Sequence, residues 1–105
     1  MAPMEPSSLR FARLARSLGA AARSAGLTAP AFRTPPRLPG VSRTIQRRGP
    51  GGVTVAVVLR GRPWAAVMAD MVEGVVVANR LGGVEADRVR CALWDAVCPA
   101  EERAA

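Results

Sequence analysis

The stretch that decides the fold is residues 49–60, which read GPGGVTVAVVLR. Val53, Val55 and Val57 alternate with smaller or polar residues after a run of turn-forming residues. An apolar alternation with a period of two predicts a β-strand with one buried face. The Gly-Pro-Gly-Gly segment predicts a turn immediately before that strand.

The residues on both sides of this stretch extend the predicted sheet. Residues 41–47 alternate weakly and predict a strand before the turn. Gly61 and Arg62 match a two-residue hairpin turn with Gly at its first position. Residues 63–69 then predict a third strand, which its opening proline places at an edge or a strand start. We therefore expect a three-stranded antiparallel meander.

Upstream of the meander, residues 7–25 have the periodicity of a basic amphipathic helix, with Gly26 as its stop. Apolar side chains share one face and arginines the other. Residues 27–40 contain four prolines, which favour an extended or turned backbone over a helix. The sequence thus predicts an N-terminal helix joined to the meander by a Pro-rich linker.

Downstream of the meander, two further helices are expected. Asp70 and Glu73 have capping-box spacing and predict the start of a helix over residues 70–81. That helix is apolar nearly all round, which is typical of a central helix buried against several neighbours. Residues 84–98 predict a last helix that ends at Pro99.

These elements predict an α+β fold: an N-terminal amphipathic helix, a Pro-rich linker and a small three-stranded antiparallel meander followed by two helices. The predicted organisation is a basic helix over residues 1–26, a linker over 27–40, a core domain over 41–98 and a flexible tail over 99–105. The chain length of 105 residues allows one small domain.

Several residue types are missing, and their absence bears on chemistry. The chain has no His, Lys or Tyr, and all 15 basic residues are Arg. Without His, the commonest acid–base group and metal ligand at neutral pH is missing. Without Lys, Schiff-base chemistry and the lysine-containing phosphate loop are excluded. We expect a protein that is not an enzyme, with no catalytic, cofactor-binding or metal-binding residues.

The net charge of +7 is concentrated in the first half of the chain. Residues 1–50 contain nine Arg and one acid, giving +8, whereas residues 51–105 contain six Arg and seven acids, giving −1. The abundance of Ala, Gly, Pro, Arg and Val is typical of a protein from a GC-rich genome, so the Arg excess is weaker evidence for a polyanion partner. Since Arg forms bidentate contacts with phosphate, the basic half is a candidate polyanion-binding region. The candidate contacts are Arg10, Arg13, Arg16, Arg23, Arg43, Arg47 and Arg48.

The basic N-terminal helix has four interpretations that the sequence leaves open. It can dock on its own domain, bind nucleic acid, lie on an anionic membrane surface, or act as an organellar transit peptide if the source is eukaryotic. No stretch is apolar enough over roughly 20 residues to predict a membrane span. We expect a cytoplasmic protein, with organellar import as the eukaryotic alternative.

A second candidate site lies on the predicted last helix. Cys91 and Cys98 are seven residues apart, so their Cα atoms should be about 10 Å apart on one side of the helix, too far for a disulfide. Trp94 lies beside them, together with Asp87. Trp is a favoured anchor at interfaces, so this side is a candidate surface for a protein partner or for self-association. A non-catalytic protein-interaction module is the leading hypothesis, and an accessory nucleic-acid-binding protein is the alternative.

Overall fold

A computed structural model describes residues 6–35 and 44–104. Within these residues it contains three helices and one three-stranded sheet, so the predicted α+β class is confirmed. In chain order, the elements are α1 (Ser7–Ser24), β1 (Ala31–Arg33), β2 (Ile45–Gly49), β3 (Gly52–Ala56), α2 (Trp64–Ala78) and α3 (Gly83–Ala104).

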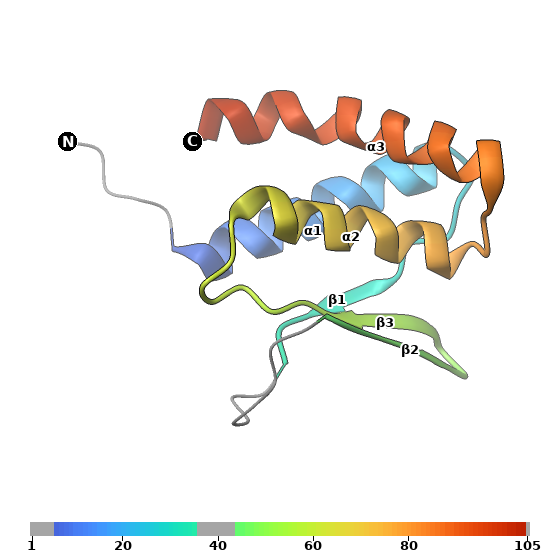
Figure 1. The fold of residues 1–105 in the computed structure, drawn as a ribbon, viewed down its shortest axis with the longest axis horizontal. Helices are drawn as coiled ribbons and strands as arrows, with labels where there is room; N and C mark the ends of the chain where they lie inside the picture. Colours follow the sequence, from blue (N-terminus) through green and yellow to red (C-terminus); the bar gives the residue numbers. More distant parts are fainter. Residues whose placement is uncertain (1–5, 36–43, 105) are drawn as a thin grey trace.

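The sheet has the strand order β1-β3-β2, with β3 in the centre (Figure 1). The β2–β3 hairpin is antiparallel and turns at Pro50 and Gly51, since Gly49 pairs with Gly52. The alternation that predicted the central strand is confirmed, because Val53 and Val55 are buried.

The predicted antiparallel meander is wrong, because the sheet is mixed. The third strand is β1, which lies in the predicted Pro-rich linker and runs parallel to β3 with Phe32 opposite Val55. Pro30 precedes this strand and Pro35 follows closely after it. Proline disfavours a helical conformation in the residue before it and keeps such a stretch extended. Three residues are too few to reveal a period of two in the sequence.

The segment predicted as the third strand, residues 63–69, instead belongs to α2. Gly61 adopts a positive φ of 74° in the turn after β3, and Pro63 occupies the N-cap position with a φ of −59°. Proline is pre-organised for a helix start because its missing N–H removes no helical hydrogen bond there. The helix therefore begins at Trp64, and Asp70 and Glu73 lie inside it rather than at its start.

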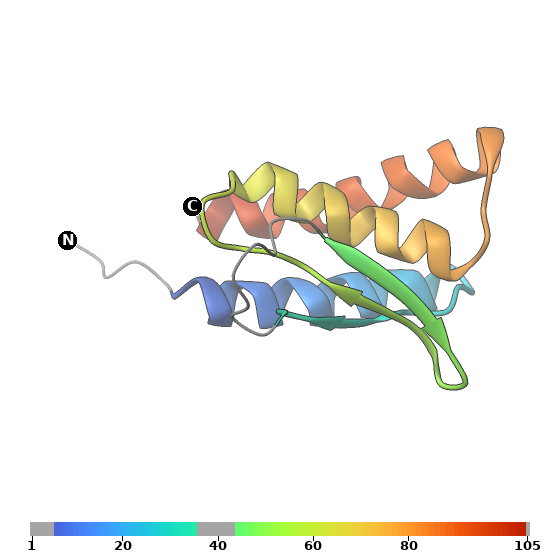
Figure 2. The same cartoon turned by 60° about the horizontal axis from the view of Figure 1, so that its bottom comes forward.

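The molecule has three layers, which Figures 1 and 2 show from two sides. All three helices lie on one side of the sheet. Helix α2 contacts β3 and both other helices, and α3 packs on α1 and α2 at the greatest distance from the sheet. The prediction of a central, nearly all-apolar helix is confirmed for α2, whose buried residues are Val67, Met68, Met71, Val72, Gly74, Val75 and Val76.

Helix α2 approaches the sheet most closely at Gly74. A Cβ atom built on Gly74 would lie 2.8 Å from Val55 Cγ2 and 3.3 Å from Phe32 Cε1. The glycine therefore allows the helix to rest directly on the inner face of the sheet. None of the described helices packs against the outer face of the sheet (Figure 2).

The two ends of the chain are also part of this packing. Helix α1 has the predicted apolar face, and its residues Leu14 and Leu18 are fully buried in the same cluster as Val55. Helix α3 does not end at Pro99 but continues to Ala104. Pro99 follows several turns of helix already formed, and Glu101 beyond it is buried. Whether residues 41–98 fold on their own stays a prediction.

Candidate functional site

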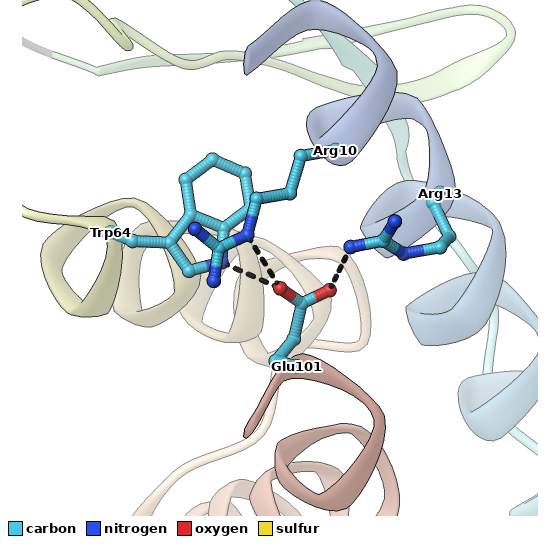
Figure 3. Close-up of polar contacts among 4 residues, drawn as sticks. All are labelled: Arg10, Arg13, Trp64 and Glu101. Atoms are coloured by element: carbon cyan, nitrogen blue, oxygen red, sulfur yellow. Dashed lines mark hydrogen bonds and ion pairs between the residues drawn. The ribbon is translucent and has the colours of Figure 1, made fainter. Parts of the chain in front are cut away.

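Two groups of arginines among the described residues bear on the candidate site, and Glu101 organises the first of them (Figure 3). Glu101 lies near the end of α3 and is 6% exposed. Its Oε2 accepts hydrogen bonds from Arg10 Nε and Trp64 Nε1, both at 2.9 Å. Its Oε1 accepts one from Arg13 Nη2 at 3.4 Å. A buried carboxylate needs such partners, so the four residues join the ends of three helices.

The Arg10 guanidinium also lies over the Trp64 ring, with its Cζ 4.3 Å from the ring centroid. The Arg10 guanidinium thus stacks on the Trp64 ring, and its Nε forms an ion pair with the Glu101 carboxylate. The Arg10 side chain is 24% exposed. These contacts hold α1 against α2 and α3. They also occupy the Arg10 guanidinium with partners in the same chain.

Two further ion pairs involve the acids of α2. Arg62 Nη1 lies 2.7 Å from Asp70 Oδ2, and the Thr44 hydroxyl donates to the same oxygen, which joins the start of β2 to α2. Arg90 donates two hydrogen bonds to Glu73, at 2.9 and 2.8 Å. These hydrogen bonds hold the pKa of Glu73 below its usual value and raise that of Arg90. The capping-box acids therefore act as ion-pair partners.

The second group of arginines lies on the uncovered side of the sheet. Paired residues on neighbouring strands project to the same side, and successive residues alternate. Because Val53 and Val55 face the helices, the strand register places the alternate residues on the other side. This outer sheet face consists of Ala31, Arg33, Ile45, Arg47, Thr54 and Ala56.

The outer sheet face is basic and open to solvent. Arg33 and Arg47 are exposed, and Ile45, on the same face of β2 as Arg47, is 50% exposed. Neither arginine forms an ion pair with a residue in the part of the chain that the structure describes. The sequence contains no acid between residues 6 and 69, so no acidic side chain of these strands or of α1 neutralises them. Two guanidinium groups are thus available to an external anion.

The predicted polyanion contacts are spread over several environments. Arg10 and Arg13 bind Glu101, whereas Arg16 and Arg23 are exposed on α1. Arg43 lies outside the described residues.

The last two predicted contacts are neighbours on β2. Arg47 lies on the outer sheet face. Arg48 projects from the opposite side of β2 and donates a hydrogen bond from Nη2 to the Val77 carbonyl at 2.9 Å. The structure therefore does not bring the seven predicted contacts together on one surface.

The predicted partner surface on α3 is divided in a similar way. Asp87 and Cys91 are exposed, and Asp87 accepts a hydrogen bond from Arg90 at 2.7 Å. Trp94 and Cys98 are partly buried and pack against the core. The helix is continuous from Cys91 to Cys98, and no disulfide joins them. The Trp94 side of α3 thus retains some exposed surface beside partly covered side chains.

Sequence reasoning missed Arg33 and Glu101. Arg33 fell in the predicted linker, where a strand of three residues leaves no readable pattern, and Glu101 fell in the predicted flexible tail. The acid-free run over residues 6–69 was a usable signal for Arg33, because no acid lies near that residue in the sequence. No local pattern marks the second, whose partners are up to 91 residues away.

The described residues show no other candidate centre. Among residues 6–35 and 44–104, no three acidic or thiol side chains gather as metal ligands would. In the same ranges, none of the helices combines the length and hydropathy needed to cross a membrane. No protein-family model, curated protein or solved structure matches this chain.

Proposed function

We propose that this protein is a non-catalytic binding protein whose outer sheet face binds the phosphate groups of nucleic acid. One observation carries the proposal: Arg33 and Arg47 are exposed on a helix-free sheet face and have no acidic partner in the described structure. Arginines at this position add little to folding, since they neither pack on the core nor complete an ion pair. The planar guanidinium fork matches phosphate, as it also matches carboxylate, in bidentate geometry.

The distribution of charge between the layers supports this assignment. The acids of the described residues lie in α2 and α3, and α3 is the layer most distant from the sheet. The outer sheet face therefore presents positive charge with little compensation nearby. Such a face attracts a polyanion from solution and orients it toward the sheet.

The test compares two pairs of exposed arginines in the full-length protein. Arg33→Glu with Arg47→Glu reverses the outer sheet face, and Arg16→Glu with Arg23→Glu reverses two exposed positions on α1. Both double variants change the net charge from +7 to +3. Binding to a labelled 20-base-pair DNA is measured by fluorescence anisotropy at low salt. We expect the sheet pair to weaken binding at least tenfold and the α1 pair to weaken it less than threefold.

Two outcomes of this comparison would reject the proposal. Equal losses in the two double variants would mean that net charge, and not the outer sheet face, determines binding. An absence of binding by the unmodified protein at low salt would exclude the proposed function. Thermal melts of all the variants show whether a loss of binding reflects a loss of folding.

A second candidate function is a protein interaction through the Trp94 side of α3. The observation that favours it is that Trp94 is only partly buried, next to an exposed Cys91. Trp94→Ala tests it by sedimentation and by thermal melting. Weaker self-association or partner capture with an unchanged melting temperature supports an interface, whereas a lowered melting temperature alone assigns Trp94 to the fold.

A further inference from the structure

The aromatic residues of the chain are all placed away from the outer sheet face. The sequence has two Phe, two Trp and no Tyr, and all four aromatic residues lie in described segments. Phe11 is buried in the core, and Phe32 lies on the inner side of the sheet, near Gly74. Trp64 stacks with Arg10, and Trp94 lies on α3. The outer sheet face consequently has no ring on which a nucleic-acid base can stack.

This arrangement discriminates between single-stranded and double-stranded ligands. Proteins that bind single strands without sequence preference gain about 1–3 kcal/mol for each base stacked on an aromatic side chain. The outer sheet face cannot supply that gain, so phosphate contacts must provide the affinity. A duplex carries about one charge per 1.7 Å of axis and releases more counterion per contact than a single strand does. Phosphate-only binding therefore favours the duplex.

The shape of the face agrees with this preference. Arg33 on β1 and Arg47 on β2 flank the central strand, and the register offsets them by two residues. From the spacing of strands and residues, their Cα atoms are about 12 Å apart. Between them β3 presents the small side chains of Thr54 and Ala56. The major groove of B-form DNA is also about 12 Å wide, so the two guanidinium groups can reach phosphates on opposite borders of a groove.

We infer that the ligand of the outer sheet face is double-stranded DNA, held by its phosphates without reading of the base sequence. The inference rests on the proposed function and adds the class of nucleic acid to it. Sequence reading needs side chains that contact base edges, and the centre of this face presents only Thr54 as a polar group. Affinity should therefore follow phosphate geometry and salt concentration rather than sequence.

The experiment measures the binding of the full-length protein to three labelled probes by fluorescence anisotropy. Two are 20-base-pair DNA duplexes of different sequence, and the third is a 20-nucleotide oligothymidine. We expect the two duplexes to bind within about twofold of each other and at least tenfold more tightly than the single strand. Plotted against the logarithm of salt concentration, the logarithm of the duplex binding constant should fall. Arg33→Ala with Arg47→Ala should make that slope shallower by about 1.8, from about 0.9 per phosphate.

A gain-of-function variant sharpens the test. Ile45 lies on the outer sheet face and is 50% exposed, so Ile45→Trp places an aromatic ring where bases can stack. We expect this variant to bind oligothymidine at least fivefold more tightly while its duplex affinity changes less than twofold. An unchanged affinity for the single strand would overturn the inference that the missing ring sets the preference.

The remaining outcomes separate the inference from the proposed function. If oligothymidine binds as tightly as the duplexes, the duplex inference is overturned while the proposed function stands. A strong preference for one duplex sequence overturns the claim of sequence-independent binding. If neither nucleic acid binds at low salt, but vesicles containing anionic phosphatidylserine do, both the inference and the proposed function are rejected.

Discussion

Arg10 on α1 and Arg47 on β2 are the same residue type in the same acid-free stretch of sequence, yet their environments are opposite. Arg10 stacks on Trp64 and binds the buried Glu101, in a packed side of the molecule where no described buried side-chain nitrogen or oxygen lacks a partner. Arg47 projects from the outer sheet face without an ion pair to a described residue. The comparison teaches that charge in the sequence becomes available for binding only where the fold provides no acid for it.

The difference arises from contacts that are distant in sequence. Arg10 is 91 residues from Glu101, and the pair forms because α1 and α3 pack side by side. In the part of the chain that the structure describes, no acidic helix covers the outer sheet face in the same way. The following predictions test whether the packed side depends on its contacts and whether the outer sheet face is independent of them.

Removal of residues 1–40 should have the largest effect. This truncation deletes α1 and β1, including Leu14 and Leu18, which are fully buried. It also exposes one edge of β3. The sequence predicted a core domain over residues 41–98, but the burial of Leu14 and Leu18 leads us to the opposite expectation. Residues 41–105 should show no cooperative thermal transition by circular dichroism, whereas the full-length protein melts cooperatively. A cooperative transition of the truncated chain would mean that residues 41–105 fold without α1 and β1.

The next effect concerns the acid that holds the α1 arginines. Glu101→Ala leaves the Arg10 guanidinium and the Trp64 N–H without their shared acceptor. Breaking a buried pair by removing one partner is strongly destabilising, and the partial exposure of Arg10 moderates the cost. We expect the free energy of unfolding in urea to fall by about 3 kcal/mol. Asp95→Ala, at an exposed position on the same helix, is the control and should change it by less than about 0.5 kcal/mol.

How far the sequence could predict this architecture depended on how local each signal is. The alternating valines of β3 and the apolar face of α1 are local patterns, and both were predicted. The strand β1 and the start of α2 were missed because the first is three residues long and the second depends on Pro63. The Glu101 contacts were missed because a residue alone in sequence carries no mark of a partner 91 positions away.

The same limit applied to the candidate site. The basic half of the chain was visible from composition, and it includes Arg47. Sequence alone could not separate Arg47 from Arg10, since both lie in the run of residues 6–69, which contains no acid. Arg33 was not singled out because its strand was not recognised. Strand register, which depends on tertiary structure, is what brings Arg33 and Arg47 to the same face.

A smaller effect should follow from filling the closest contact on the inner side of the sheet. Gly74→Ala places a methyl group 2.8 Å from Val55 Cγ2, closer than real Cβ contacts allow. We expect a loss of about 2 kcal/mol in the free energy of unfolding, because overpacking outweighs the better helix propensity of alanine. Gly19→Ala is the matched control in α1, where the nearest atom is the end of the flexible Arg23 side chain at 3.2 Å. This control should be neutral or stabilising by up to about 1 kcal/mol.

The smallest effect on stability should come from the arginines of the outer sheet face. It tests whether they differ from Arg10, which contributes to the packing of the helices. Arg33→Ala with Arg47→Ala removes two exposed side chains that make no ion pair with described residues. Their mutual repulsion is also weak, because about 12 Å exceeds the Debye length of about 10 Å at 0.1 M salt. We expect the free energy of unfolding to change by less than about 0.5 kcal/mol in urea titrations. A decrease of more than about 1 kcal/mol in the free energy of unfolding would show that these two arginines stabilise the fold, as Arg10 does. That result would contradict the assignment of the outer sheet face as a binding surface.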